Sequence, residues 1–283
     1  MDQVYVVRHK VLVEGRSAKQ VAAELGISRN TVRGYVEGAE LSRKPVTRPA
    51  PVLKAVRPRI GDFAVVGDDV VLGDGVVLHP HVVIAPGVVL ESNVEVFPGA
   101  FIGKEPKGAG ATARIPEFER TVRIGKNCSV GPHSVIFYDV EIGEGTLLGD
   151  GASTREQGRV GSRCIISRYV TLNYNVRVGH RTKVMDLTHL TGNCTVGDDV
   201  FVSVHVSTVN DNTLRAEGYS ADRIVGPTLE DGCAIGANAV LLPNIRIGAR
   251  AVVAAGAVIT ADVAPGDRVF GIPARSRKGS ATK

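Results

Sequence analysis

The side chains of this sequence best suited to moving a proton near neutral pH are its seven histidines. A protonated amine has no lone pair, so an enzyme that uses an amine as nucleophile needs a base, and imidazole is the usual one. His180 and His189 are nine residues apart in the middle of the chain. Their places in the repeat described below distinguish them from the other five, for which no catalytic role is predicted: His9, His79, His81, His133 and His205.

The chain also has four cysteines, Cys128, Cys164, Cys194 and Cys233, none of which forms a CxxC pair. Their spacing therefore gives no sign of a zinc site or a redox dithiol. Aromatic residues make up only 5% of the 283 residues, Trp is absent, and there are 33 glycines. This composition predicts a core of small and branched aliphatic side chains rather than an aromatic pocket.

No apolar run approaches the roughly 18 residues that a membrane helix requires. The first ten residues carry charges and lack the apolar centre of a signal peptide. A cytoplasmic protein is therefore expected.

From Ile60 onward, an aliphatic residue recurs every six positions through three runs, 60–102, 124–208 and 229–259. All of these positions hold Val, Ile or Leu except Thr154 and Thr208. Within these runs, the position four residues after each aliphatic one holds Ala, Val, Ser, Thr or Cys, except at Gly158 and Ile245, and all four cysteines occupy such a slot. A period of six fits neither a helix nor a simple strand. It predicts short parallel strands joined by tight corners, three hexads to a triangular coil, with both slots pointing inward.

This reading makes the cysteines small buried hydrophobes rather than thiol or zinc ligands. Two segments interrupt the period, 103–121 and 209–228, and both are predicted to loop out of the coils, where binding residues often lie.

The basic character of the chain belongs to its N-terminal part. Residues 1–59 hold 12 Lys and Arg against 5 Asp and Glu, a net charge of +7, while the remainder holds 22 against 24, a net charge of −2. Such asymmetry indicates an anionic partner for the N-terminal part or a solvated basic arm. Residues 43–59 are rich in Pro and basic residues and are predicted to be a linker. The predicted organisation is therefore a helical domain at 1–42, this linker, a β-helix at 60–275 and a basic tail at 276–283.

Within the helical domain, residues 17–26 and 29–36 are predicted to be two helices, with a turn at Ile27 and Ser28. This pattern resembles the helix-turn-helix of transposase and resolvase-type DNA-binding domains. The resemblance implies that DNA would be contacted by Arg29, Asn30, Thr31 and Arg33. A helical bundle that serves assembly is the alternative.

Residues 60–275 resemble the hexapeptide-repeat acyltransferase superfamily. The hexads from Ile235 to Val258 match its repeat, and the ending 271–275 (GIPAR) is similar to the close of its acetyl-CoA-dependent members. The resemblance implies a mainly β fold, the left-handed parallel β-helix, to which this chain adds a small α-helical domain. It also implies a homotrimer, with the acyl donor, acetyl-CoA or another acyl-CoA, in the groove between adjacent subunits and no metal.

The resemblance also assigns roles to the two histidines. His180 is the third residue of the hexad 178–183, the slot in which sugar acyltransferases of this superfamily carry their catalytic base. His189 ends the next hexad, where bacterial amino-sugar N-acetyltransferases and sialic acid O-acetyltransferases place a histidine near the donor. The superfamily's acidic residue after the base is Arg181 here, so we expect Asp186 or Asn175 to orient the imidazole or contact the substrate.

The register of the repeat suggests further site residues. Gly236 and Ala254 occupy equivalent slots in stacked hexads and are predicted to lie against the donor's pantetheine arm. Asn210, Asp211 and Arg215 lie in the second interruption and are predicted to reach the acceptor, a nucleotide-linked amino sugar.

Other functions fit parts of the same pattern. A sugar O-acetyltransferase is the nearest alternative, followed by a DNA-binding or scaffold protein with an inactive β-helix. A zinc enzyme of the γ-carbonic anhydrase type needs three converging histidines, and the spacing of His180 and His189 does not favour it.

Overall fold

The structure is a computed structural model that describes residues 3–36, 56–111, 114–213 and 220–276. The chain divides into two compact units, Met1–Lys54 and Ala55–Lys283. The described part of the first contains α1 (Gln3–Arg8), a π-helix (His9–Val13), α2 (Ala18–Leu25) and α3 (Arg29–Val36). The helices α2 and α3 coincide with the two that the sequence predicts. The helix α1 and the π-helix were not predicted, because their valines are poor helix formers.

A small apolar core holds the N-terminal helices together, made of Val7, Val21, Ala22 and Val32. Ser17 caps α2 in a capping box with Gln20, and Gly26 ends it in the left-handed conformation with φ 63°. The Ser28 hydroxyl accepts a hydrogen bond from the Thr31 N–H at 3.0 Å and so caps α3. These caps produce the helix–turn–helix connection.

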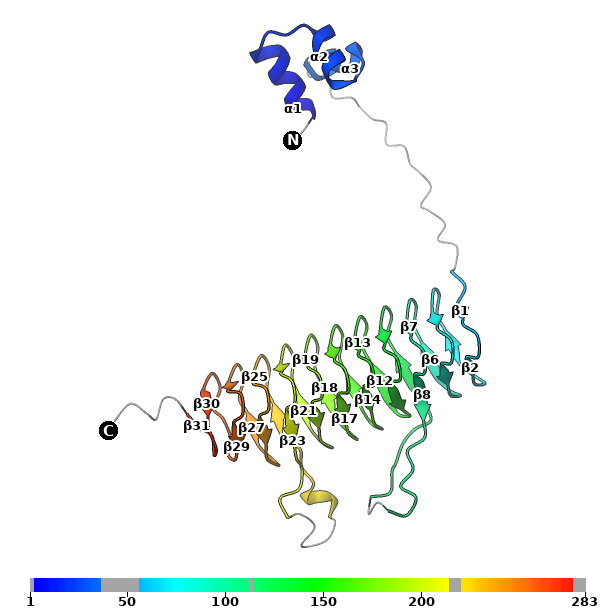
Figure 1. The fold of residues 1–283 in the computed structure, drawn as a ribbon, viewed down its shortest axis with the longest axis vertical. Helices are drawn as coiled ribbons and strands as arrows, with labels where there is room; N and C mark the ends of the chain where they lie inside the picture. The colour runs from blue at the N-terminus through cyan, green and yellow to red at the C-terminus, as the bar shows by residue number, and fades with distance from the viewer. Residues whose placement is uncertain (1–2, 37–55, 112–113, 214–219, 277–283) are drawn as a thin grey trace, which may run out of the picture. The chain divides into compact units, whose positions relative to one another are not determined.

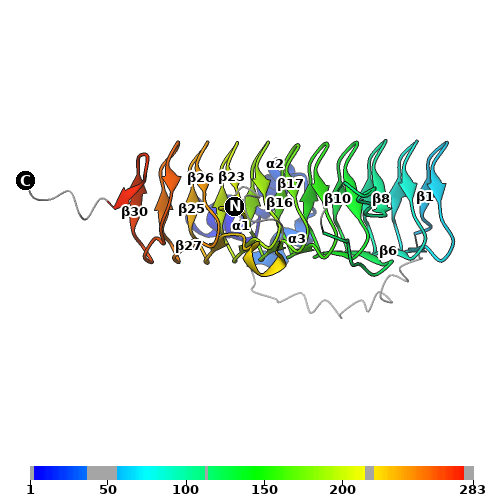
Figure 2. The same cartoon turned by 90° about the horizontal axis from the view of Figure 1, so that it is seen from below.

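The second unit is a parallel β-helix, as the period of six predicts (Figure 1). Its two- to four-residue strands form three flat sheets, which make the three faces of a prism. Successive strands belong to sheets A, B and C in turn, so each coil has an A-to-B, a B-to-C and a C-to-A corner. Figure 2 shows the coils stacked one after another along the axis.

Sheet A has twelve strands, parallel except for the last pair. They are β1 (Arg59–Ile60), β4 (Val77–Leu78), β7 (Glu95–Val96), β10 (Ser129–Val130), β13 (Leu147–Leu148), β16 (Ile165–Ile166), β19 (Lys183–Val184), β22 (Phe201–Val202), β25 (Ala234–Ile235), β28 (Val252–Val253), β30 (Arg268–Phe270) and β31 (Arg275–Ser276).

Sheet B has ten strands. They are β2 (Val65–Val66), β5 (Val83–Ile84), β8 (Phe101–Lys104), β11 (Val135–Phe137), β14 (Ser153–Thr154), β17 (Thr171–Leu172), β20 (His189–Leu190), β23 (Ser207–Thr208), β26 (Val240–Leu241) and β29 (Val258–Ile259). Sheet C has nine strands. They are β3 (Val71–Leu72), β6 (Val88–Leu90), β9 (Val122–Ile124), β12 (Val140–Ile142), β15 (Arg159–Val160), β18 (Arg177–Val178), β21 (Thr195–Val196), β24 (Thr228–Leu229) and β27 (Arg246–Ile247).

The chain leaves the prism twice, between β8 and β9 and between β23 and β24. Both excursions start from B-to-C corners and project from the same edge of the prism (Figure 1). The second contains a short 3-10 helix, Ala221–Arg223. The two loops therefore share one edge, which the spacing of the interruptions in the sequence does not make obvious.

All four cysteines are buried inside the prism and unpaired. Burial raises the pKa of Cys128 to about 11 and that of Cys194 to about 12, so both thiols stay protonated at neutral pH. Cys128 and Cys164 alternate with Thr146 and Thr182 in the small inward slot of the C-to-A corner. The side chains in this column donate to carbonyl groups of the next coil, as the Thr182 hydroxyl does to Gly197 at 2.7 Å.

We expect Thr182→Val to lower the free energy of unfolding by about 2–4 kcal/mol, because two buried backbone groups lose their partner. The Thr182 hydroxyl donates to the Gly197 carbonyl and accepts from the Val200 N–H at 3.1 Å. Urea unfolding measures the change. The control is Thr195→Val, at an exposed position on β21, which should leave the midpoint unchanged. Equal effects of the two substitutions would show that the column contributes no special stability.

Candidate functional site

His180 lies at a C-to-A corner, directly after β18, and its ring is exposed. Its Nδ1 accepts a hydrogen bond from the backbone N–H of Ser162 in the preceding coil at 3.0 Å. A neutral imidazole that accepts at Nδ1 carries its proton on Nε2. The free ring nitrogen of His180 is therefore a hydrogen-bond donor, and a base would need the opposite arrangement.

The same contact recurs along this edge of the prism. Asp198 Oδ1 accepts the N–H of His180 at 2.8 Å, and Asp231 Oδ1 accepts the N–H of Asp198 at 2.8 Å. Each of these side chains caps the corner of the coil before it. His180 thus has a structural function that an aspartate performs in the next two coils.

No carboxylate orients the ring of His180 in the described part of the chain. Arg181, in the slot where the superfamily has an acid, pairs instead with Asp198 at 3.1 Å and Asp199 at 2.6 Å. The hydrogen bond from Arg181 lowers the pKa of Asp199. The orienting contact to His180 is consequently the Ser162 backbone.

The two residues expected to orient the imidazole have other partners. Asp186 lies at an A-to-B corner, where it accepts hydrogen bonds from Ser167 and Arg168, and these lower its pKa. Asn175 lies at a B-to-C corner and donates to Asn193 at 2.9 Å. Because both are on other edges of the prism, neither orients His180 within a single chain.

His189 is the first residue of β20, on the outer surface of sheet B between Thr171 and Ser207. Its Nδ1 lies 2.6 Å from the Thr171 hydroxyl oxygen. The ring is half-buried, and burial lowers its pKa. His189 is thus neutral at pH 7, with Nδ1 held by Thr171 and no hydrogen bond to Nε2 from any residue that the structure describes.

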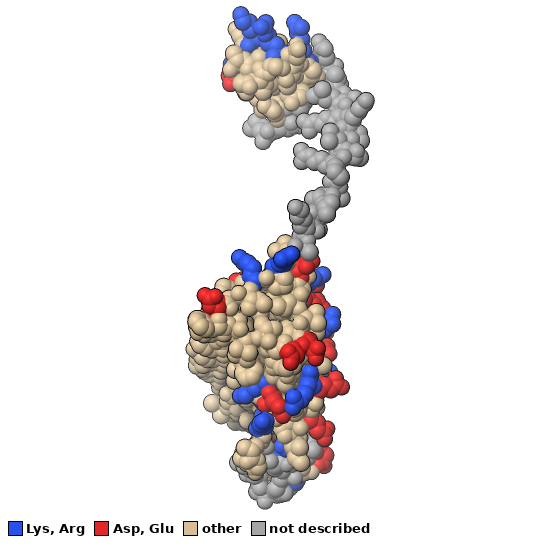
Figure 3. Space-filling view, turned by 90° about the vertical axis from the view of Figure 1, so that its right-hand side faces the viewer, with Lys and Arg blue, Asp and Glu red and all other residues tan. Residues whose placement is uncertain are grey.

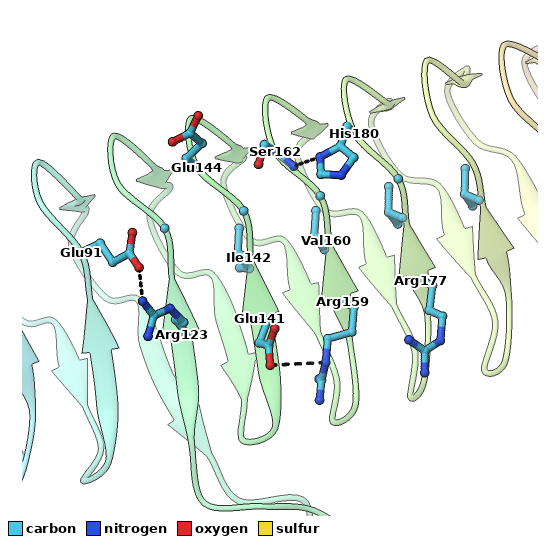
Figure 4. A pocket seen from close by; sticks show the side chains of 16 residues that line it. Glu91, Arg123, Glu141, Ile142, Glu144, Arg159, Val160, Ser162, Arg177 and His180 are labelled. Carbon is cyan, nitrogen blue, oxygen red and sulfur yellow. Dashed lines mark hydrogen bonds and ion pairs between the residues drawn. The ribbon is translucent and has the colours of Figure 1, made fainter.

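An open groove of about 620 Å³ runs along the outer surface of sheet C and ends at His180 (Figure 4). One side is formed by side chains that point outward from the strands, among them Arg123, Arg159 and Arg177. The other side is formed by corner residues, among them Ser162 and His180, and the arginine side chains point away from that corner. Sequence reasoning missed these arginines, although Arg159 and Arg177 are 18 residues apart, one full coil.

Glycines of the C-to-A corner line the floor of the groove. A Cβ on Gly161 would lie 2.7 Å from the carbonyl carbon of Gly179, and one on Gly179 would lie 2.4 Å from Asp198 Oδ1. Only glycine fits where successive corners stack this closely. The floor of the groove is open because these stacked corner positions are glycines and have no side chains.

The predicted site residues lie on different sides of a single chain. His180 is at a C-to-A corner and His189 is on face B, since nine residues are half of an 18-residue coil. The predicted donor residues Gly236 and Ala254 are at A-to-B corners, after β25 and β28. A single chain therefore does not bring the two histidines or the donor residues together.

The predicted acceptor residues belong to the B-to-C edge. The Asn210 amide donates to the Gly192 carbonyl at 3.1 Å, and Asp211 Oδ1 accepts from the Thr213 N–H and hydroxyl at 2.8 and 2.7 Å. Arg215 lies outside the described residues. Asn210 and Asp211 thus stabilise the start of the second loop.

A contact that the sequence did not predict fixes the first loop to the same edge. Arg114 forms an ion pair with Glu156, whose side chain is fully buried, and its guanidinium lies 3.9 Å from the ring centroid of Tyr174. Arg155 also pairs with Glu156 at 3.1 Å. The break in the small-residue pattern at Gly158 was the only hint of an unusual coil here.

No cluster of three or more His, Cys, Asp or Glu side chains that could hold a metal ion occurs in the described ranges. Within the same ranges, every helix is too short or too polar to cross a membrane.

Three segments of the chain match known hexapeptide families. Residues 57–86 and 226–261 match the family Bacterial transferase hexapeptide (six repeats), and residues 121–153 match the Hexapeptide repeat of succinyl-transferase. The 2,3,4,5-tetrahydropyridine-2,6-dicarboxylate N-acetyltransferase of Staphylococcus aureus (strain bovine RF122 / ET3-1) is 53% identical over 47 residues, which are 17% of this chain and 20% of that protein.

The serine acetyltransferase of Buchnera aphidicola subsp. Acyrthosiphon pisum (strain APS) is 34% identical over 89 residues, 31% of this chain and 32% of that protein. The chain therefore spans between a fifth and a third of the length of these curated relatives. The solved UDP-N-acetylglucosamine acyltransferase from Campylobacter jejuni is 17% identical, with a TM-score of 0.47 over 76% of this chain and 72% of that one. The matched segments, spread along a parallel β-helix of the same period, show that this unit is built from hexapeptide repeats of the kind found in bacterial transferases.

Proposed function

We propose that this protein transfers an acetyl group from acetyl-CoA to the amino group of a nucleotide-linked amino sugar. Support for acyl transfer comes from the hexapeptide matches and from relatives that are named as acetyltransferases. The observation that carries the mechanism is His189, a half-buried histidine with one ring nitrogen held by Thr171 and a lowered pKa.

His189 is the general base in this proposal. If Nδ1–H donates to the Thr171 hydroxyl, Nε2 carries the lone pair that takes the proton of the attacking amine. Because burial lowers the pKa of His189, the ring is in this basic form at pH 7. The amine then attacks the thioester carbonyl carbon, the C–S bond breaks, and the proton leaves with the CoA thiol.

His180 acts as a hydrogen-bond donor in the same reaction. Its Nδ1 is occupied by the Ser162 N–H, so its Nε2–H is available to the carbonyl oxygen that becomes negatively charged. In this proposal His189 is the base and His180 the hydrogen-bond donor, whereas the sequence-based hypothesis made His180 the base. It follows from the partners of the two rings.

Because the two histidines are on different sides of one prism, they can meet only across a subunit interface. The outward slots of face B hold no Asp, Glu, Lys or Arg from Val65 to Val258, and face A exposes Leu147, Phe201 and Val252 beside only two charged residues between Val77 and Val252, Glu95 and Lys183. Face C, in contrast, carries charged residues in four neighbouring outward slots, Arg123, Glu141, Arg159 and Arg177, and Figure 3 shows charged side chains concentrated along one side of the prism. Face A of one subunit therefore packs on face B of the next, and three such contacts close a ring.

This packing places the C-to-A edge of one subunit beside the B-to-C edge of its neighbour. His180 would then lie near the neighbour's Asn175, its second loop with Asn210 and Asp211, and its face B with His189. The predicted site residues of these two edges meet in the homotrimer.

Thiol release from acetyl-CoA tests the proposed function. The full-length protein should release CoA only when an amine-bearing nucleotide sugar is present, at a rate proportional to enzyme concentration. The same sugar with a hydroxyl in place of the amine is the matched control. Release with the hydroxyl sugar alone would mean O-acetylation, and no release with either would contradict acyl transfer to sugars.

A second candidate function concerns the N-terminal unit, which we propose binds duplex DNA. Figure 3 shows Lys and Arg side chains gathered on one part of its surface. Its two described acidic side chains are used in ion pairs with Lys10 and Arg16. Within residues 3–36 this leaves Arg8, Lys19, Arg29 and Arg33 without a carboxylate partner, and Arg8 donates instead to the Tyr35 carbonyl. Arg29, Asn30 and Arg33 are exposed on α3, whereas Thr31 is bonded to Ser28.

We expect Arg29→Ala with Arg33→Ala to weaken binding to a fluorescent 30-base-pair duplex by at least about 10-fold at 50 mM salt, because two phosphate-neutralising charges are lost. Fluorescence anisotropy measures the affinity. Arg16→Ala, which removes a guanidinium already paired with glutamates, is the matched control. Identical affinity of both variants and the wild type would exclude α3 as the contact surface.

A further inference from the structure

The two loops of the B-to-C edge are joined to each other by a continuous series of side-chain contacts. Both loops leave the prism at this edge, the first between β8 and β9 and the second between β23 and β24 (Figure 1). The B-to-C corners that lie between them along the axis include Glu156, Tyr174 and Gly192. The contacts run from Arg114 of the first loop, over these three residues, to Asn210 of the second.

A buried carboxylate fixes the first loop to the prism. The Glu156 side chain is completely buried and forms ion pairs with Arg114 and Arg155, the latter at 3.1 Å. A buried charge is very unfavourable without its partners, so the carboxylate holds both guanidiniums in place. Near the other end of the loop, the ring of Phe118 stacks on that of Tyr138 with centroids 6.2 Å apart. The described part of the loop is therefore attached at two points.

The ring of Tyr174 connects Arg114 to the corner of the next coil. The guanidinium carbon of Arg114 lies 3.9 Å from the ring centroid, a cation–π contact. A Cβ on Gly192 would lie 2.4 Å from Tyr174 Cζ and 2.7 Å from both Cε atoms. The φ of Gly192 lies outside the left-handed region, so its backbone does not require glycine. Room for the Tyr174 ring is the reason that this corner has no side chain.

The corner that contains Gly192 also holds the second loop. The Asn210 amide donates to the Gly192 carbonyl at 3.1 Å, and the Asn193 amide donates to the Ile224 carbonyl at 2.7 Å. Asn193 Oδ1 in turn accepts from the Asn175 amide at 2.9 Å. Both described ends of the second loop are thus attached to the corner on which Tyr174 packs.

We propose that Arg114 is a positioning residue for the acceptor: by holding the Tyr174 ring against Gly192, it fixes the corner to which the second loop is attached. The inference rests on the proposed function, in which the second loop reaches the amino sugar. Arg114 acts through Tyr174 and does not touch the reacting atoms. The predicted donor residues lie on the A-to-B edge, so Arg114 affects the acceptor and not acetyl-CoA.

Hydrogen exchange of the full-length protein, followed by mass spectrometry, tests the connection without requiring turnover. Arg114→Ala should speed exchange within residues 220–227 at least about fivefold, because the Val225 N–H is bonded to the Asn210 carbonyl at 3.1 Å and opens when that corner moves. Glu156 keeps Arg155 as a partner in this variant, so the coils should remain folded.

Arg120→Ala is the matched control, since it removes another guanidinium of the same loop. Arg120 pairs with Glu105 at 3.1 Å and lies 6.0 Å from the ring centroid of Tyr138, at the other attachment of the loop. Exchange within 220–227 should match that of the wild type in this variant.

Gly192→Ala tests the middle of the series while leaving Arg114 intact. The added methyl group cannot coexist with the Tyr174 ring in its present place, so this variant should reproduce the faster exchange of Arg114→Ala. In thiol-release assays both variants should raise KM for the acceptor about 10-fold, and leave kcat and KM for acetyl-CoA within about twofold.

Three results would overturn the proposal: unchanged exchange in both the Arg114 and Gly192 variants, equal acceleration in Arg120→Ala, or an unchanged KM for the acceptor in a variant whose second loop exchanges faster. Faster exchange in a protein without acyltransferase activity would preserve the connection between the loops and refute the proposed reaction. The two inferences can therefore fail separately.

Discussion

We expect His189→Gln to lower kcat for acyl transfer by about 10²- to 10⁴-fold, the usual contribution of a general base. Glutamine has nearly the volume of histidine and can still bond to Thr171, but it cannot take a proton from the amine. The thiol-release assay at saturating acetyl-CoA measures the change. KM should change little, because the proton moves only in the transition state.

The matched control for this substitution is His205→Asn, at an exposed A-to-B corner whose positive φ of 58° asparagine tolerates. It should keep wild-type activity and the same thermal midpoint. A second variant, His180→Asp, separates the roles of the two rings. Aspartate keeps the cap on Ser162, as Asp198 does for His180, and removes the Nε2–H donor. Full activity of His189→Gln together with total loss in His180→Asp would show that His189 is not the base.

The pH dependence of the rate provides an independent check on His189. Burial disfavours the imidazolium, so its pKa lies below the ordinary value of 6.5. The basic form therefore persists below pH 6.5, and kcat should fall only as the pH drops through that lowered pKa. With His189→Gln this acid limb should disappear from the residual rate. An acid limb centred above 6.5 would contradict the assignment.

Phe201→Arg should dissociate the assembly and abolish activity, with at least about a 10²-fold loss, because it removes an exposed apolar ring from face A and adds a second cation beside Lys183 that would be buried against the uncharged face B of a neighbour. Phe201 is 43% exposed in the single chain, so the substitution should not disturb the core. Light scattering after gel filtration measures the mass, and thiol release measures the activity.

Val71→Arg is the control for this experiment, since Val71 is 56% exposed on face C, which the proposed packing leaves free. Its mass and activity should match those of the wild type. A trimeric Phe201→Arg protein would show that face A is not the interface. A monomer that keeps full activity would show that the site needs no second subunit.

Mixing two inactive variants tests whether the site is shared. Subunits carrying His180→Asp and His189→Gln, unfolded and refolded together in equal amounts, would form mixed trimers in which one interface has both histidines intact. Random mixing predicts recovery of about a quarter of the wild-type activity. Recovery near zero, from variants that refold and assemble, would mean that the two histidines do not serve one site.

The sequence by itself determined the architecture of the larger unit. An aliphatic residue every six positions, with a small one four residues later, repeats the same local geometry in each hexad, so the contacts of one coil predict those of the next. The ends of α2 and α3 were equally predictable, because Ser17, Gly26 and Ser28 act on backbone groups only a few residues away. The first helix was not, since its valines disfavour a helix, and its stabilising contacts are tertiary: Val7 packs in the small core and Arg8 donates to the Tyr35 carbonyl.

The candidate site was predictable only in part. The register placed His180 at a corner and His189 on a strand, and nine residues of separation already meant opposite sides of an 18-residue coil. What only the tertiary structure decided was which atom each ring touches. Ser162 and Thr171 each lie 18 residues from the histidine they contact, one coil away across the stack.

The same reason explains the arginines of the groove and the attachment of the first loop. Arg123 pairs with Glu91, whereas Arg177 has no carboxylate within ion-pair distance in the described ranges, and this difference depends on which strands are neighbours in the sheet. Arg114 meets Glu156 across 42 residues, and the loop that carries it has no period from which its path follows. Local spacing dictates how a regular coil winds, whereas the partners of its polar side chains depend on which coils and loops the completed fold brings into contact.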